Sequence, residues 1–250
     1  MFINFLTEYS GIKAYFTDRK GGVSPSPFAS LNMGYNTNDN YVTKNREIVK
    51  SALNIPNITE IVPTQVHKTD IAVIDKNNLS DKINFVGEFD GLCTKDKNIL
   101  LTTCHADCLA VYLYDYKNQV IGLAHAGWKG TLGNIAEKTF TKMRDELGAD
   151  ITTTVSAISP GISKCCFEVG DEVYFKFKEN YSYIDDYAVK KANGKYMLDL
   201  KGINLRQFND MGINRVEISP YCTSCNTDLF YSYRKENGIT GRMSAGIILI

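Results

Sequence analysis

Three short segments of the chain carry side chains that can bind a metal or act as a nucleophile. They are TQVH at 64–67, CHADC at 104–108 and HAGWKG at 125–130. One side chain from each segment, His67, Cys108 and His125, would together give a zinc ion two imidazoles and a thiolate. Such a set leaves the fourth position of the ion open for water or substrate, which is typical of catalytic rather than structural zinc sites.

The spacing of these three residues does not by itself decide between a metal site and a packed core. Their separations are far longer than the short paired spacing of zinc fingers. The histidines can equally be hydrogen-bonded core residues, and Cys108 a buried apolar thiol. Two features favour the metal. Gly127 and Gly130 flank the only tryptophan and permit close backbone approach. Asp107 sets a carboxylate, costly to bury, beside an apolar run.

The elements that must position these segments follow from the hydrophobic pattern. It predicts strands at 13–17, 71–74, 99–103, 109–114, 120–124, 153–158, 215–219 and 244–250. It predicts helices at 40–53, 130–147, 168–178 and 200–211. Each chemical segment therefore lies at the edge of a strand, where sites are commonly built. The order of elements favours an α+β fold with mixed sheets over a doubly wound one.

Composition restricts the class of protein. The chain has 250 residues, 44% of them apolar, with 28 basic and 28 acidic side chains and a formal net charge of zero. Without a fixed repeat or linker-like tract, we expect one domain over residues 1–250. No cluster of basic residues supports nucleic-acid binding. Apolar runs far shorter than the roughly 20 residues of a membrane span, and the lack of a signal-like start, predict a cytoplasmic protein that does not bind membranes.

Seven cysteines cannot all pair within the chain. In a protein without a secretory signal, free thiols or metal ligands are favoured over disulfides. The CTSC segment at 222–225 has redox-motif spacing but does not open a helix in a βαβ unit. A second zinc site made by Cys222 and Cys225 with Cys165 and Cys166 is conceivable. Packing of the adjacent pair Cys165 and Cys166 at a helix start is the favoured interpretation.

In their order along the chain, the three chemical segments resemble the laccase-domain family. This family is described both as multicopper polyphenol oxidoreductases and as zinc-dependent purine nucleoside phosphorylases. The likeness covers nearly the whole chain, because it extends to DRKGGVS at 18–24, SLNMG at 30–34, SPGISKCCFEVG at 159–170, FYSYR at 230–234 and TGR at 240–242. Two residues depart from the family pattern: His105 replaces a usual Thr, and Met243 replaces a frequent Gln.

The resemblance implies a four-layer domain, helix, sheet, sheet, helix, with its site in a surface groove. It implies that His67, Cys108 and His125 are the metal ligands and the catalytic centre. The activity implied is phosphorolysis of adenosine, inosine, guanosine and methylthioadenosine, with hydrolytic deamination of adenosine beside it. The extra imidazole of His105 leaves open which histidine titrates with activity.

Phosphorolysis needs an anion-binding group. Arg46 in the first helix and Arg19 or Ser24 in the glycine loop are the candidates, because a guanidinium can grip phosphate at two points. Lys129 and Arg242 are weaker candidates. The alternative for Arg46 is a solvated helix face.

Deamination needs an activated water, and bound zinc lowers the pKa of its water toward about 7. Asp107 is the candidate proton shuttle. The alternative is that its carboxylate orients a metal ligand.

Other activities remain open. A copper-dependent polyphenol oxidase is one, although three ligands are too few for a coupled four-copper centre. A Cys–His hydrolase that uses Cys108 with His125 is another. The expected partners are a purine nucleoside and phosphate, the expected cofactor is Zn²⁺ with Cu²⁺ as the alternative, and the chain is a monomer or a homodimer.

Overall fold

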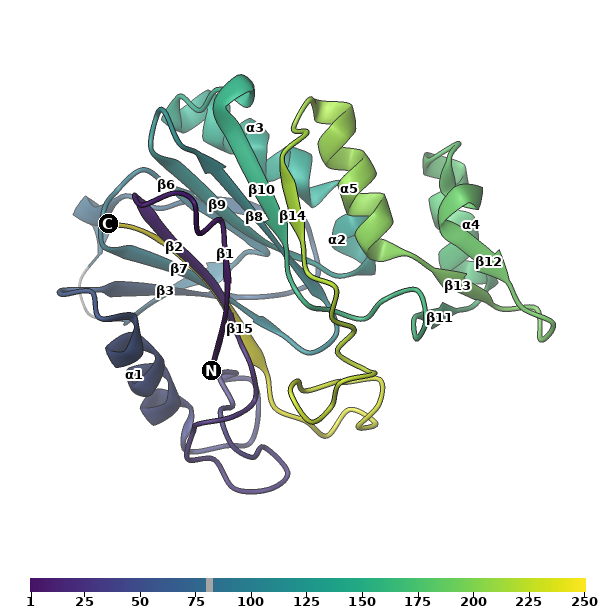
Figure 1. Ribbon diagram of the computed structural model, residues 1–250, viewed down its shortest axis with the longest axis horizontal. Coiled ribbons are helices and arrows are strands. Elements are labelled where there is room, and N and C mark those ends of the chain that lie inside the picture. The colour runs from purple at the N-terminus through teal and green to yellow at the C-terminus, as the bar shows by residue number, and fades with distance from the viewer. Residues whose placement is uncertain (80–82) are drawn as a thin grey trace.

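Two six-stranded sheets form the centre of the molecule in the computed structural model, which describes residues 1–79 and 83–250 (Figure 1). The first sheet has the order β1 (Phe2–Phe5), β2 (Ile12–Thr17), β15 (Met243–Leu249), β7 (Ile99–His105), β3 (Thr59–Thr64) and β5 (Ile83–Glu88). The second has the order β14 (Val216–Ile218), β10 (Thr154–Ile158), β8 (Leu109–Asp115), β9 (Val120–Ala126), β6 (Gly91–Thr94) and β4 (Ile71–Val73). Both sheets mix parallel and antiparallel pairs.

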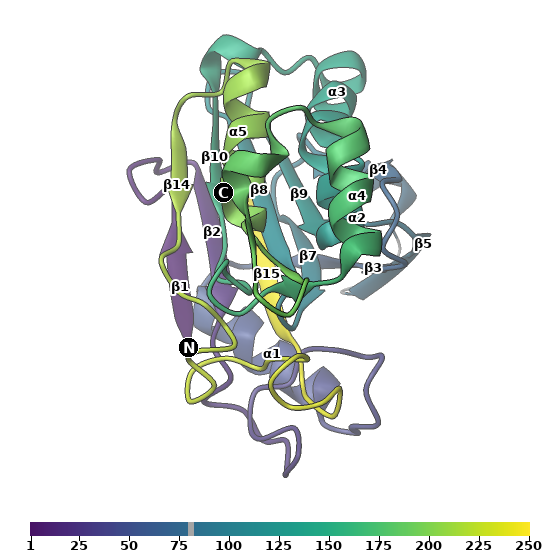
Figure 2. The same cartoon turned by 90° about the vertical axis from the view of Figure 1, so that its right-hand side faces the viewer.

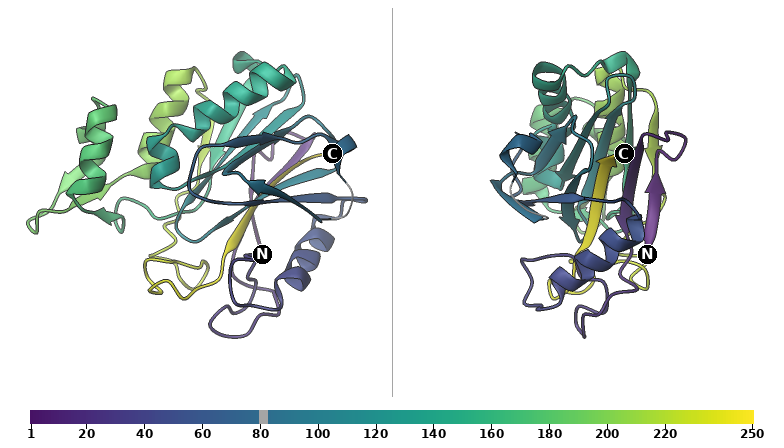
Figure 3. Two further views of the ribbon diagram at one scale, coloured as in Figure 1. Left: turned by 180° about the vertical axis from the view of Figure 1, so that it is seen from behind. Right: turned by 90° about the vertical axis from the view of Figure 1, so that its left-hand side faces the viewer.

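Helices cover the outer face of each sheet. The outer face of the first sheet packs on α1 (Val42–Leu53), and that of the second on α2 (Trp128–Leu132), α3 (Ile135–Leu147) and α5 (Leu200–Met211). Figure 3 shows α1 and α3 on opposite sides of the strands. The layers are therefore α/β/β/α, and the predicted α+β class with mixed sheets is confirmed.

Strand β8 shows why the layers form. All seven of its residues are buried, and alternate side chains point to opposite faces of a strand. Leu109, Val111 and Leu113 pack in the core beneath the helices, whereas Tyr112 and Tyr114 pack in the core between the two sheets. An apolar run of this length thus fits a central strand that is covered on both sides.

A smaller unit stands at one end of the second sheet. It consists of α4 (Asp171–Asn180) with the three-stranded sheet β11 (Glu168–Val169), β13 (Tyr196–Leu198) and β12 (Ala188–Lys190). Short 3-10 turns lie at η1 (Lys76–Asn78), η2 (Ile151–Thr153) and η3 (Ile184–Tyr187). The loops before α1 and before β15 gather at the end of the molecule away from α3 (Figure 2).

The structure has every strand and helix that the sequence predicts, with three changes. The long predicted helix 130–147 is two helices, because Asn134 adopts a left-handed backbone and its side chain caps α3 by accepting from the Glu137 amide. The predicted helix 168–178 begins only at Asp171, since Glu168 and Val169 pair with β13. Cys165 and Cys166 consequently precede a short strand, not a helix start.

In the part of the chain that the structure describes, the strands β1, β3, β5, β6, β11, β12 and β13 were not predicted. Among the described residues no helix has the length and hydropathy that crossing a membrane requires.

Candidate functional site

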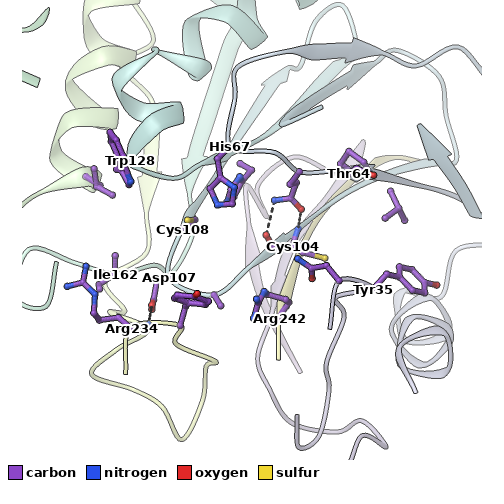
Figure 4. A pocket seen from close by; sticks show the side chains of 18 of the residues that line it. Tyr35, Thr64, His67, Cys104, Asp107, Cys108, Trp128, Ile162, Arg234 and Arg242 are labelled. Atoms are coloured by element: carbon purple, nitrogen blue, oxygen red, sulfur yellow. Dashed lines mark hydrogen bonds between the residues drawn. The ribbon is translucent and has the colours of Figure 1, made fainter. Parts of the chain in front are cut away.

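His67, Cys108 and His125 come together where the two sheets meet. His67 lies in the loop that leaves β3 of the first sheet for β4 of the second, Cys108 directly precedes β8, and His125 lies near the end of β9. Pairing of β8 with β9 sets Ala110 opposite His125, which brings Cys108 close. One ligand atom from each of the three residues lies within 4.8 Å of the others. Figure 4 shows His67 and Cys108 facing the same space.

A buried carboxylate, Asp90, fixes both histidines. It lies at the start of β6 and is fully buried. Its Oδ1 accepts a hydrogen bond from His125 Nδ1 at 2.9 Å and another from the backbone N–H of His67 at 3.1 Å. Its Oδ2 accepts from the amides of Val66 and Lys68 at 3.1 and 2.7 Å. Because Nδ1 of His125 is held in this way, Nε2 is the nitrogen left to bind a ligand.

These hydrogen bonds set the charge of Asp90 and the shape of the loop. Burial raises the pKa of the Asp90 carboxyl, but the bonds from His125 and from the Lys68 and Val66 amides outweigh burial, so its pKa is lowered. The three successive amides can converge on one carboxylate because His67 adopts a left-handed backbone, with φ of 58°. Asp90 therefore remains ionised and orients two members of the cluster.

Cys108 and His125 form a thiolate–imidazolium pair. Burial alone would raise the pKa of the Cys108 thiol, but the charge of His125 and hydrogen bonds from both cluster histidines lower it to about 6. Burial likewise disfavours charge on His125, yet the Cys108 thiolate and Asp90 raise its pKa to about 9. At neutral pH the metal-free pair is therefore ionised, and the sulfur is in the form that binds metals and attacks electrophiles.

His105 uses both of its ring nitrogens in hydrogen bonds that do not involve the ligand atoms of the cluster. It is buried, its Nδ1 donates to the carbonyl oxygen of Cys108 at 3.1 Å, and its Nε2 accepts from the Thr103 hydroxyl at 2.8 Å. Burial and the neighbouring His125 lower its pKa well below the usual value. His105 is thus neutral and holds the backbone of Cys108 instead of offering a nitrogen to the cluster.

The cluster opens into a cavity of about 680 Å³. This volume is within the usual range for small-molecule sites, about 300–1,000 Å³. Aromatic rings and guanidinium groups line it beside the three cluster residues; they are Tyr35, Phe85, Trp128, Phe167 and Tyr233, with Arg46, Arg234 and Arg242. Phe85 and Tyr233 are more than half exposed although they belong to this wall. Exposed rings beside a cluster of polar groups are suited to holding a planar ligand.

Of the residues predicted to bind an anion, some line the cavity and others do not. Arg46 lines the cavity but is buried, forms an ion pair with Glu60, and donates from two nitrogens to the Met33 carbonyl. The solvated helix face considered for Arg46 is therefore wrong. Glu60 and burial act in opposite directions on its pKa, which is raised. Its charge is already balanced by Glu60.

Arg19, Ser24 and Lys129 lie outside the cavity wall. Arg19 forms an ion pair with Glu236 at 3.1 Å, and the Ser24 hydroxyl donates to Asp39 at 2.6 Å. Lys129 is exposed on α2. None of the three side chains therefore belongs to the cavity wall, whereas Arg242 does.

Arg242 and Arg234 present guanidinium groups to the cavity (Figure 4). One terminal nitrogen of Arg242 donates to the carbonyls of Thr240 and Gly241 at 2.8 and 2.9 Å. One terminal nitrogen of Arg234 donates to the Glu168 carbonyl at 3.0 Å. A guanidinium has five N–H donors, so each side chain is anchored and still has donors for an anion. Arg234 was not among the predicted candidates.

Asp107 lines the same cavity but is held by two hydrogen bonds. Its Oδ1 accepts from the Thr223 hydroxyl at 2.6 Å, and its Oδ2 accepts from the backbone N–H of Arg234 at 2.7 Å. This carboxylate therefore ties the loop that carries Arg234 to the segment that carries Cys108.

Two residues of the site escaped the sequence reasoning for different reasons. Asp90 has no motif around it beyond its place before an apolar strand, so its contact with His125 has no local signal. Arg234 belongs to the FYSYR segment that carried part of the family resemblance, and that was the available signal.

The three donors fit a zinc ion. Imidazole and thiolate both bind zinc, three protein ligands leave its fourth position open as in catalytic sites, and a carboxylate behind one histidine is the usual orienting partner. Gly127 leaves space for the ion, because a Cβ at this position would lie 2.9 Å from Cys108 Sγ and 3.6 Å from His67 Cδ2. The space next to the sulfur is thus kept clear by the lack of a side chain.

Comparison with known proteins places this site in context. Residues 13–250 match the model of a family described as multi-copper polyphenol oxidoreductase laccase. A purine nucleoside phosphorylase of Staphylococcus epidermidis is 34% identical over 96% of this chain and 92% of its own. The purine nucleoside phosphorylase YlmD of Bacillus subtilis is 33% identical over 94% of this chain and 87% of its own.

Solved structures agree with the observed architecture. The crystal structure of YlmD from Geobacillus stearothermophilus superposes with a TM-score of 0.90 at 34% identity, over 96% of this chain and 93% of that chain. The crystal structure of the Bacillus licheniformis hypothetical protein YfiH gives a TM-score of 0.91, also at 34% identity and with the same coverage.

Proposed function

The chain belongs to the family described as multi-copper polyphenol oxidoreductase laccase, and from this premise we propose that it is a zinc-dependent purine nucleoside phosphorylase. One observation carries the proposal: the cluster of His67, Cys108 and His125 opens into a cavity that also holds aromatic rings and two anchored arginines. The names of the relatives from Staphylococcus epidermidis and Bacillus subtilis support the same activity.

The roles of the cluster residues follow from its chemistry. His67, Cys108 and His125 would hold the zinc ion, which when bound polarises an oxygen of a substrate or lowers the pKa of a water molecule. Asp90 keeps His125 in the tautomer that presents Nε2. His105 holds the Cys108 backbone in place. These contacts reduce the freedom of the ligands before any ion binds.

Phosphorolysis forms a bond between a phosphate oxygen and C1′ of the ribose and breaks the bond from C1′ to the purine nitrogen, which leaves with the electron pair. Arg234 and Arg242 are the residues that we assign to the phosphate, because their guanidinium groups line the cavity and are anchored by backbone carbonyls. Tyr35, Phe85 and Tyr233 would stack on the base. The proposed substrates are adenosine, inosine, guanosine and methylthioadenosine.

Deamination of adenosine at the same centre is a second part of the proposal. It requires a proton to pass from the attacking water to the leaving amine, and Asp107 was the predicted shuttle. Because both oxygens of Asp107 accept hydrogen bonds from Thr223 and Arg234, we assign it instead to positioning the cavity wall.

A Cys–His hydrolase is the second candidate, and one observation favours it. The Cys108 thiolate, His125 and Asp90 form a nucleophile, base and orienting carboxylate in hydrogen-bond sequence. Activity of such an enzyme would be independent of metal. Phenol oxidation by a four-copper centre is not proposed, because the chain has only three histidines, and both ring nitrogens of His105 are hydrogen-bonded to Thr103 and Cys108.

The test compares purine release with and without phosphate in the native protein, three variants of the cluster and one control variant. We expect release from adenosine and inosine to depend on phosphate, to be lost on chelation, and to return with Zn²⁺. His67→Ala, Cys108→Ala and His125→Ala should each abolish it, whereas Arg19→Gln, outside the cavity, should not. Equal rates without phosphate and after chelation would refute the phosphorylase and favour the hydrolase.

A further inference from the structure

A second cluster of possible metal ligands consists of four cysteines, one of which directly precedes the cavity residue Phe167. The Sγ atoms of Cys165, Cys166, Cys222 and Cys225 all lie within 4.8 Å of one another. Cys225 Sγ is 3.6 Å from that of Cys165 and 3.3 Å from that of Cys166. We propose that these four cysteines bind a structural zinc ion.

The sulfur separations favour a metal over a disulfide. Zinc–sulfur bonds of about 2.3 Å place the four sulfurs of a tetrahedral site about 3.8 Å apart. The separations of 3.6 and 3.3 Å are close to this value and far above the roughly 2.05 Å of a disulfide bond. With four protein ligands, no position is left for water or substrate, so the site is structural and not catalytic.

The surrounding groups suit a site that carries negative charge. A zinc ion with four thiolates has a net charge of about −2. The backbone N–H of Ser163 donates to Cys222 Sγ at 3.4 Å, and the N–H of Cys225 donates to the same sulfur. Lys201, which is buried, interacts electrostatically with Cys222 and Cys165, and its ammonium is held by the carbonyls of Ser219 and Tyr221.

The site would cross-link two segments that both shape the cavity. Gly161 forms an isolated parallel β-bridge with Cys222, so the two segments that carry the cysteines lie side by side at this point. Phe167, next to Cys166, lines the cavity, and Thr223, next to Cys222, donates to Asp107. Arg234 in turn donates to the Glu168 carbonyl. The metal would thus hold the wall that carries Arg234, without itself touching the substrate.

The exposure of two of the four thiols also favours a bound metal. Cys165 and Cys225 are exposed, and exposed free thiols oxidise readily. Coordination would protect both of them. The structure therefore accounts for four of the seven cysteines by one site.

The experiment measures zinc per chain by elemental analysis in protein purified without chelator. The native protein should hold about two zinc ions, Cys222→Ser/Cys225→Ser about one, and Cys108→Ser about one. Cys93→Ser, at a buried cysteine that belongs to neither cluster, is the control and should hold about two. Cys108→Ser should keep its single ion although inactive, so this count stands or falls separately from the phosphorylase proposal.

A thiol titration of the native protein gives a second measurement. Cys165 and Cys225 should resist a thiol reagent until a chelator is added, and then react without a reductant. A requirement for reductant would identify a disulfide, and immediate reaction would identify free thiols. Either result, a zinc content unchanged in Cys222→Ser/Cys225→Ser, or iron and sulfide in place of zinc would overturn the proposal.

Discussion

Replacing Asp90 with asparagine should weaken metal binding without touching a ligand. Four donors converge on the two oxygens of Asp90: Nδ1 of His125 and the amides of Val66, His67 and Lys68. An asparagine at this position has one accepting oxygen, and its NH₂ group would face N–H donors with which it cannot form hydrogen bonds. Loss of such an orienting carboxylate costs about 10–100-fold in metal affinity, or ~1.4–2.7 kcal/mol.

The same change should destabilise the metal-free fold. Breaking a buried charged pair costs about 3–5 kcal/mol, because the remaining partner loses its compensating charge. Asp90→Asn removes one of the two anionic partners of the buried His125 imidazolium and leaves the Cys108 thiolate in place, so the loss should fall below this range. Denaturant unfolding of the metal-free protein measures this loss as a lower midpoint.

Asp115→Asn is the matched control. Asp115 is also fully buried, and it accepts hydrogen bonds from Lys117, Asn118, Asp150 and Thr153 at the far end of β8. This variant should lower the unfolding midpoint but leave zinc affinity unchanged in a competition titration with a chromophoric chelator. Unchanged affinity in Asp90→Asn, or an equal loss in both variants, would refute the assigned role of Asp90.

Three further predictions concern the same site. Zinc binding at about pH 8 should release one proton from His125, because this pH lies between the pKa of Cys108 near 6 and that of His125 near 9. Zinc affinity should therefore rise with pH until about 9. Binding heats that are the same in buffers of different ionisation enthalpy would contradict this. Gly127→Ala should lower zinc affinity, measured by the same chelator competition, because its Cβ would crowd Cys108 Sγ at 2.9 Å; native affinity would count against the cleared space. Arg234→Gln should raise the KM for phosphate at least about tenfold, because it removes one charge-assisted hydrogen bond to phosphate. Arg19→Gln should leave this KM unchanged. The same KM in Arg234→Gln as in the native protein would remove Arg234 from the phosphate site.

Sequence patterns predicted the central strands because burial on both faces leaves a continuous apolar run. β8 and β9 are such runs, and their pairing was signalled by the polar turn between them. β3 and β6 escaped because Pro63 interrupts the first and the second is a four-residue segment that begins with glycine. Asn134 looked like part of a continuous helix because its left-handed backbone has no apolar signature.

The cluster residues of the candidate site could be predicted from the sequence, whereas the residues that depend on contacts between distant segments could not. His67, Cys108 and His125 were chosen by residue chemistry and family resemblance, and the fold brings them together. Asp90 could not be chosen, since its role depends on a contact between strands that the sequence does not encode locally. Arg46 and Arg234 both line the cavity, and only the fold decides that Arg46 is buried and paired with Glu60 whereas Arg234 is exposed.

The most direct test of the central claim follows the fate of phosphate in a reaction with inosine. Phosphorus NMR of the zinc-loaded protein should show ribose 1-phosphate appearing in equal amount with hypoxanthine, and Cys108→Ala should produce neither. Hypoxanthine formed together with free ribose, while the inorganic phosphate signal stays constant, would contradict the phosphorylase account.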